Sequence, residues 1–128
     1  AEPALVGLRS GLADADPRVR TAAADTASRR PDGAALADAL ITGLADADPE
    51  VRLAAARSLG ALQVAAAFPA LQQRLADPSP EQRLAALRAL TRIDRDRTAA
   101  LPELSRLASD PDARVAEAAN RALAARAR

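Results

Sequence analysis

Residues 14–20 read DADPRVR, and the pattern returns 32 residues later, where residues 46–52 read DADPEVR. Two looser copies follow: residues 77–83 read DPSPEQR and residues 110–116 read DPDARVA, after further steps of 31 and 33 residues. Each copy leads into an Ala-rich segment. Four copies at a nearly constant period predict a repeat protein, because accidental similarity does not keep a period. We expect one domain over residues 1–128, with units at about 1–31, 32–62, 63–95 and 96–128.

Each unit is predicted to contain two helices. In the second unit Asp48 has the character of an N-cap and Pro49 that of a first helical residue. Apolar or small residues then follow at helical spacing from Val51 to Leu62, and Leu36, Leu40 and Leu44 mark the preceding helix. No strand is expected. The expected helices are 3–13, 17–29, 33–45, 49–62, 65–76, 80–93, 99–109 and 112–126.

The composition supports an all-α fold with close helix packing. The chain has 37 Ala and 18 Leu, both strong helix formers, and Phe68 is its single aromatic residue. All 18 basic residues are Arg, and 17 acidic residues leave a net charge of +1. The chain therefore has no global field that would attract nucleic acid or a membrane surface. No apolar run reaches the roughly 18 residues of a membrane span.

These units resemble the HEAT-repeat family, in particular the PBS-lyase HEAT-like repeats. Such repeats have an Asp, a Val five residues later, an Arg and an Ala-rich helix; Pro69 and Pro102 match a Pro typical of their first helices. The resemblance implies an all-α fold, a right-handed α-α superhelix (alpha solenoid) of about four helical hairpins with eight helices. It also implies that the second helices line the concave surface. Gln82 stands where the Val is expected, and Ala116 where the last Arg is expected.

In this family the repeated Asp and Arg residues imply a structural ladder, which we call the Asp–Arg ladder. The carboxylates are expected to bind turn N–H groups, and the guanidinium groups to bridge neighbouring turns, because Arg makes several hydrogen bonds at once. Ala116 predicts that this ladder is incomplete at the C-terminal end. The expected ladder residues are Asp14, Asp46, Asp77, Asp110, Arg20, Arg52 and Arg83.

A helical wheel of the second helices gives candidate binding positions. With Val51 as the core direction, Leu53 lies at about 200° and Arg57 at about 240°, so both are expected to be exposed. Across the units these positions form two strips. One strip is Thr21, Leu53, Leu84 and Glu117, and the other is Asp25, Arg57, Arg88 and Arg121. We expect Leu53, Leu84, Arg57, Arg88 and Arg121 to bind a partner.

Catalysis is not expected. The sequence has no His, Cys or Lys, and so it lacks an ordinary base near neutral pH, a thiolate, a Schiff-base amine and nitrogen or sulfur ligands for zinc. Three of the paired carboxylates recur at one place in the repeat, as capping residues would. The fourth pair lies in the segment 94–97, DRDR, which we expect to be a solvated linker. No cofactor and no metal site are predicted.

The sequence favours a non-catalytic protein-binding scaffold or accessory subunit, as a subunit of a larger assembly, that docks a partner protein on its concave face. A first alternative is an anion or nucleic-acid site along Arg57, Arg88 and Arg121, with nucleic acid disfavoured because the single aromatic residue, Phe68, is expected on a core face and cannot stack on bases. A second alternative is a non-catalytic partner in bilin lyase-like chemistry. The start Ala1-Glu2-Pro3 is compatible with a cleaved signal peptide and hence with an exported or periplasmic protein, the alternative being cytoplasmic. A fragment of a longer solenoid is a third possibility.

Overall fold

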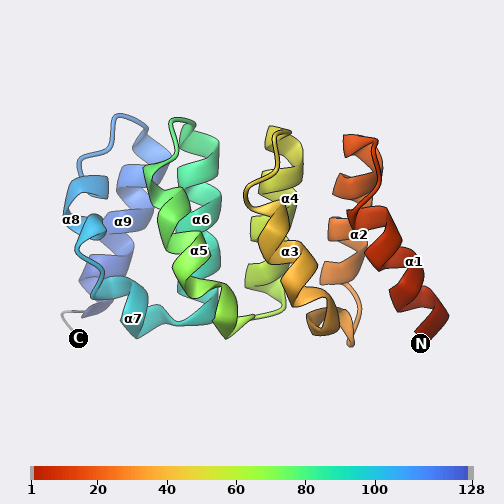
Figure 1. Cartoon of the computed structure of the whole chain (residues 1–128). Coiled ribbons are helices and arrows are strands. Elements are labelled where there is room, and N and C mark those ends of the chain that lie inside the picture. The colour runs from red at the N-terminus through yellow and green to blue at the C-terminus, as the bar shows by residue number, and fades with distance from the viewer. Residues whose placement is uncertain (1, 127–128) are drawn as a thin grey trace.

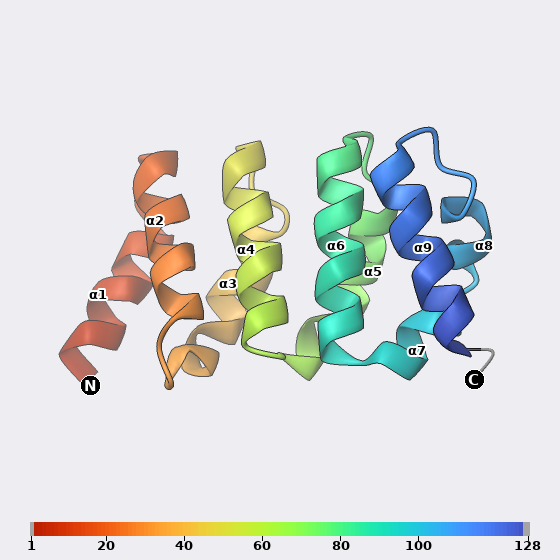
Figure 2. The same ribbon diagram turned by 180° about the vertical axis from the view of Figure 1, so that it is seen from behind.

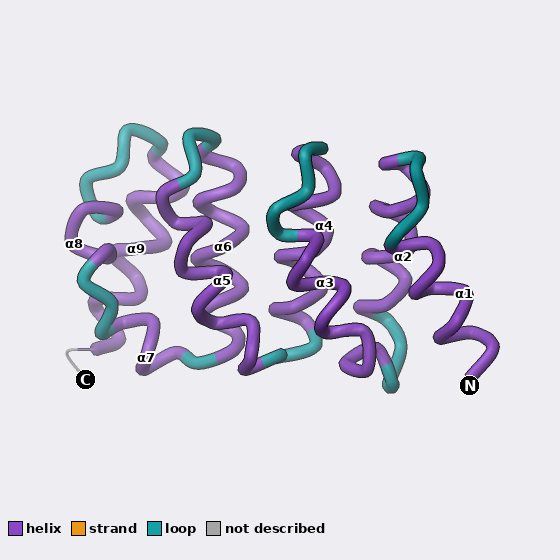
Figure 3. The backbone as a smooth tube through the Cα atoms, viewed as in Figure 1, coloured by secondary structure: helices purple, strands orange, loops and turns teal. Residues whose placement is uncertain are grey.

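The computed structural model describes residues 2–126, and this part of the chain contains nine α-helices, three short 3₁₀ helices and no strand (Figure 3). Ala1 and residues 127–128 lie outside the described residues. Ala1 is the first residue of the Ala1-Glu2-Pro3 segment on which the expectation of export is based. The first-layer helices are α1 (Glu2–Leu12), α3 (Ala37–Gly43), α5 (Phe68–Gln73), α7 (Arg95–Ala99) and α8 (Glu103–Leu107). The second helices are α2 (Pro17–Ser28), α4 (Pro49–Ala61), α6 (Pro80–Ile93) and α9 (Ala113–Arg126). The 3₁₀ helices are η1 (Gly33–Leu36), η2 (Ala65–Ala67) and η3 (Arg74–Ala76).

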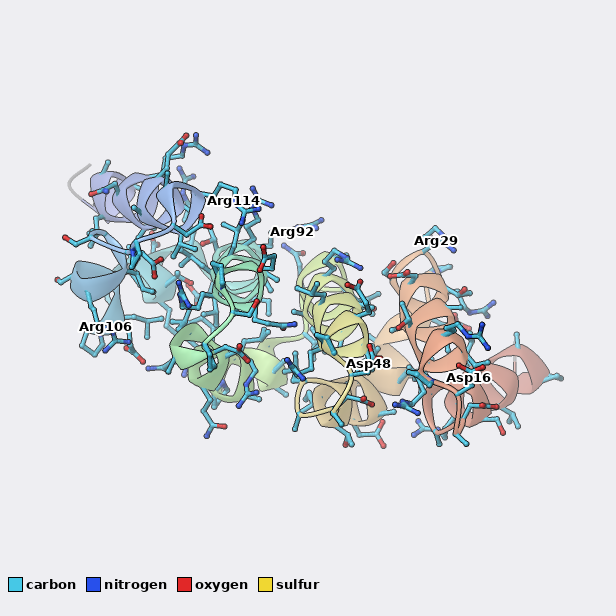
Figure 4. The ribbon with its side chains drawn as sticks, turned by 90° about the horizontal axis from the view of Figure 1, so that it is seen from above. Asp16, Arg29, Asp48, Arg92, Arg106 and Arg114 are labelled. Carbon is cyan, nitrogen blue, oxygen red and sulfur yellow. The ribbon has the colours of Figure 1, made fainter. Side chains whose placement is uncertain are left out.

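The helices form two layers that run the length of the molecule, with the two termini at opposite ends (Figure 1). From behind, the second helices α2, α4, α6 and α9 stand side by side (Figure 2). Each second helix packs on the next, α2 on α4, α4 on α6 and α6 on α9. Seen from above, the row of second helices is curved, and its concave side is the side that the first-layer helices do not cover (Figure 4). The fold is therefore the expected all-α solenoid, with its second helices on the concave side.

A recurring turn begins the second helices. In each copy the first Asp accepts a hydrogen bond from the backbone N–H two residues later, over 2.8 to 2.9 Å. In the second copy Asp48 then caps α4, because its Oδ1 accepts the N–H of Glu50 at 2.8 Å and that of Val51 at 3.3 Å. Pro49 occupies the first helical position, where a missing N–H has no cost. Side-chain capping by Asp16 and Asp48 thus fixes where α2 and α4 start, whereas Ser79 makes no such bond at the start of α6.

The expected helix 99–109 is wrong, and so is the expectation of eight helices for the described part of the chain. Two short helices, α7 and α8, replace it. Asp94 starts α7 by accepting the Arg97 N–H at 3.0 Å, and its backbone carbonyl accepts the Thr98 hydroxyl at 2.7 Å. Pro102 lacks an N–H and disfavours helical backbone at the residue before it, so the helix cannot continue. The segment expected to be a solvated linker is therefore mostly helix.

The core consists mainly of Ala and Leu from both layers around the buried Phe68. Val51 and Val115 occupy equivalent buried positions, and the side-chain amide of Gln82, also buried, donates to the Pro49 carbonyl at 2.9 Å. This bond satisfies the polar group that replaces the expected Val. Val19, at the same place in the first repeat, is 40% exposed because no earlier repeat covers it in the described chain.

The Asp–Arg ladder joins neighbouring repeats. Arg20 donates to both carboxylate oxygens of Asp46, at 2.9 and 3.0 Å. Arg83 donates to both oxygens of Asp110, at 2.9 Å each. These bonds lower the pKa values of both carboxyl groups below the usual aspartate value, since they favour the charged form.

The middle ladder contact is the loose one. Arg52 donates to the carbonyls of Asp46 and Ala47, but its Nε lies 4.0 Å from the Asp77 carboxylate and has no hydrogen-bond partner. Arg74 lies 3.8 Å from the same carboxylate. Asp77 is thus shared between two cations, and the contact between the second and third repeats is the weakest of the three.

Candidate partner-binding groove

A groove of 1030 Å³ opens on the concave face between α4, α6 and α9. Its floor consists of Leu and Ala side chains and the backbone of Gly60, and its walls carry charged residues. We call it the arginine groove. The candidate residues from the sequence all line it, and they are Leu53, Arg57, Leu84, Arg88 and Arg121.

Three of these residues form a row across the helices. Arg57, Arg88 and Arg121 are each the ninth residue of their helix, in α4, α6 and α9 respectively. All three are exposed. The helices α4, α6 and α9 stand side by side (Figure 2). Equal positions along neighbouring helices therefore place these residues in a row across the groove. We call these three residues the Arg row.

The expected exposure of Leu84 is wrong. Leu84 is 5% exposed and belongs to the hydrophobic core, whereas Leu53 is half-buried. The helical wheel considered one helix alone, but α6 packs between α4 and α9, and both neighbours cover its flanks. Leu84 therefore forms part of the groove floor, and Leu53 is the apolar candidate that remains accessible.

Positive charge dominates the groove, which is lined by six Arg and two Glu. Three of the Arg side chains have carboxylate neighbours. Arg114 lies 3.4 Å from Glu81, Arg121 pairs with Glu117, and Arg57 lies 3.8 Å from Asp25 on the neighbouring helix α2. The groove is thus only partly neutralised by its own acids.

The other three arginines of the groove are Arg88, Arg92 and Arg95. All are exposed, and within residues 2–126 no carboxylate oxygen lies within 4.0 Å of any of them. Figure 4 shows Arg92 on the side of the second helices, whereas Arg106 lies on the other side of the molecule, on the first-layer helix α8. The unpaired charge therefore gathers near the C-terminal end of α6.

Sequence reasoning missed Arg92, Arg95 and Arg114. Arg92 was detectable, because it follows Arg88 by four residues and so shares its helix face. Arg95 was assigned to a linker, and only the Asp94 cap that starts α7 brings it to the groove. For Arg114 no repeat column gave a signal.

The two strips from the helical wheel line two hollows rather than one. Their first-repeat members, Thr21 and Asp25, line a separate hollow of 350 Å³ together with Asp48 and Glu50. Three of the four charged residues around this hollow are acidic, the exception being Arg18. The concave face is therefore acidic near α2 and basic from α4 to α9.

Residues 2–126 contain no group of three or more His, Cys, Asp or Glu side chains that could hold a metal ion. In the same part of the chain, none of the helices combines the length and apolar character needed to cross a membrane. The arrangement that the groove does offer is a set of guanidinium groups that can bind carboxylates or phosphates.

Comparisons with known proteins support the fold. A family model described as HEAT repeats matches residues 37–124. No curated protein matches the chain. A similar solved structure is the crystal structure of an engineered protein, with 27% identity and a TM-score of 0.72. The similarity covers 92% of this chain, which spans 60% of that structure.

Proposed function

This chain belongs to the HEAT-repeat family, whose members generally act as scaffolds for protein interactions, and we propose that it is a non-catalytic protein-binding scaffold or accessory subunit. It docks an acidic segment of a partner protein in the arginine groove, on its concave face. The partner protein and this chain then form part of a larger assembly.

The charge of the groove supports this proposal most strongly. Six Arg face two Glu in a hollow of 1030 Å³, and three of the Arg side chains lack a carboxylate neighbour among the described residues. Exposed guanidinium groups beside apolar surface are typical of protein interfaces, where Arg is enriched among the energetically important residues. Leu53 supplies accessible apolar surface at the edge of the row. An acidic segment with apolar residues complements both features.

Binding of a labelled peptide that contains Glu and Leu residues tests the proposal. We expect Leu53→Glu to weaken binding strongly, because it places a negative charge beside an acidic ligand and removes apolar contact. The matched control is Ser105→Glu, which changes the net charge equally at an exposed position of α8, in the opposite layer. Equal affinity of the two variants would contradict docking in the groove.

A second candidate function is binding of a nucleic acid or another polyanion along the Arg row, which the same six arginines favour. If all six contacted phosphates of a single strand, the logarithm of affinity would fall with a slope of about −4 against the logarithm of salt concentration. For this ligand we expect Leu53→Glu to reduce the affinity less than Arg88→Ala does. Steep salt dependence with single-stranded DNA, and tighter binding of DNA than of the peptide, would favour this alternative.

A role as a non-catalytic partner in bilin lyase-like chemistry stays a prediction from the family resemblance. It names a particular setting for the same docking activity, and the groove residues do not distinguish that setting from others. The single-domain boundaries and the ladder role of the Asp and Arg residues likewise remain proposals.

A further inference from the structure

The spacing of the Arg row limits what can bind to it. Arg57, Arg88 and Arg121 occur at the same position of three neighbouring helices. Packed helices lie roughly 8–10 Å apart. The row therefore presents one guanidinium side chain at about every 8–10 Å across the groove, at right angles to the helices.

The contact between Asp25 and Arg57 shows how a carboxylate can pair with the Arg row. Asp25 is the ninth residue of α2, and so it continues the row on the next helix. Its carboxylate lies 3.8 Å from the guanidinium of Arg57. Side chains at this position thus reach across one helix spacing, and a carboxylate placed along the row can pair with an arginine.

Three regular conformations of a bound segment can be compared with this spacing. In polyproline II, every third residue lies on the same side, at intervals of about 9.3 Å. In a β-strand, residues three apart lie on opposite faces. In an α-helix, residues seven apart lie about 10.5 Å apart on one face, which is just above the roughly 8–10 Å spacing of packed helices. The polyproline II interval lies within that range.

We infer that the groove selects an extended acidic segment of the partner, in polyproline II conformation, with acidic residues at positions i, i+3 and i+6. This inference rests on the proposed function and makes it more specific. The segment runs across α4, α6 and α9, and each acidic side chain pairs with one arginine of the Arg row.

The three arginines contribute unequally. Arg57 and Arg121 already have acidic neighbours, Asp25 and Glu117, which the ligand must replace or share. Arg88, in the middle, has no carboxylate within 4.0 Å among the described residues. The central acidic residue of the ligand therefore gives the largest gain.

Two peptides of identical composition test the spacing. One has the order Glu-Pro-Pro-Glu-Pro-Pro-Glu, and the other has its three Glu residues adjacent, followed by the four Pro residues. Fluorescence anisotropy at about 20 mM salt, where exposed charges are weakly screened, measures both affinities. We expect the spaced peptide to bind about fivefold tighter or more, because it makes two additional ion pairs.

Two variants assign that difference to the row. Arg88→Ala should reduce the preference for the spaced peptide to less than about twofold, since the central pair is lost. Arg106→Ala is the matched control, because Arg106 is an exposed arginine of α8 in the opposite layer, and it should leave the preference unchanged.

Each other outcome has a defined meaning. Equal binding of the two peptides would overturn the spacing while leaving acidic docking in place. Tighter binding of a helical peptide with Glu at every seventh residue would overturn the extended conformation. If neither peptide binds at roughly 1 mM, a concentration that detects even weak complexes, both the spacing and the proposed acidic ligand are refuted.

Discussion

Replacing Arg83 by Ala should lower the free energy of unfolding by about 3 kcal/mol, because it breaks a largely buried ion pair between repeats. Arg83 donates two hydrogen bonds to Asp110, and two more to the carbonyls of Asp77 and Pro78, at 2.9 Å each. The Arg83 side chain is 15% exposed and that of Asp110 is 6% exposed. After the substitution the Asp110 carboxylate would keep only the N–H of Asp112. Loss of one partner of a buried pair costs about 3–5 kcal/mol, and the residual exposure places this case at the lower end.

The same change at the loose contact should cost less. Arg52→Ala removes two hydrogen bonds to backbone carbonyls, at 2.8 and 3.3 Å, but the nearest Arg52 nitrogen is already 4.0 Å from the Asp77 carboxylate. We expect a loss of about 1–2 kcal/mol. Arg88→Ala serves as the control, because an exposed side chain without an ion pair should change stability by less than about 0.5 kcal/mol.

Urea unfolding followed by far-UV circular dichroism measures these differences. With a slope of about 2 kcal/mol per molar urea, Arg83→Ala should shift the midpoint by about 1.5 M, at unchanged slope. The reasoning is refuted if Arg83→Ala shifts the midpoint no more than Arg88→Ala does. It is also refuted if Arg52→Ala costs as much as Arg83→Ala.

Two further predictions concern stability. The Arg114 hydrogen bond lowers the pKa of Asp112 from 3.8 to about 2. The ionised Asp112 therefore stabilises the fold fully above pH 3.8, and this stabilisation is lost as the pH falls toward 2. Acid titration of the Arg114→Ala variant should show a shallower loss of stability over this range than the unmodified chain. Gly60→Ala should destabilise the chain, because a Cβ there would lie 2.9 Å from a backbone carbon of α6, whereas Gly7→Ala, with nothing within 4 Å, should stabilise it by about 0.5–1 kcal/mol; thermal melts of both variants check this, and equal shifts would contradict it.

The arrangement of the repeats followed from the sequence because its signals are local and repeated. An Asp that caps a helix, a Pro at its first turn and apolar residues at helical spacing act within a few residues of each other. The Asp48 cap and the Pro49 start are examples. Four copies at one period then left stacking of neighbours as the means of covering each apolar face.

Other features depended on contacts that local patterns do not contain. Leu84 was expected to be exposed because its wheel position ignores the helices on both sides of α6. The split of the expected helix 99–109 depends on competition between the Asp94 cap and the break at Pro102. The loose contact between Arg52 and Asp77 joins two repeats, and its 4.0 Å separation could not be predicted from either repeat alone.

The candidate site was predicted in part for the same reason. The Arg row follows from the repeat period, since equal positions in equal helices must align. The surroundings of the Arg row do not follow, because Arg95 lines the groove from α7, a short helix that the repeat pattern did not predict. The period thus predicts regular spacing but not the local charge.

The two sides of each second helix are subject to different constraints. The core side of α4 is fixed by contacts with two neighbours, and the backbone at Gly60 already lies too close to α6 for a Cβ to fit without a shift. The ninth position faces solvent in the groove, where a change of side chain costs little stability. The residue at this position differs among the four repeats: it is Asp25 in α2 and an arginine of the Arg row in α4, α6 and α9. A fourth acidic residue beyond Arg57 would therefore meet Asp25, whose negative charge opposes it, and the reversal of sign confines an acidic ligand to the three C-terminal repeats.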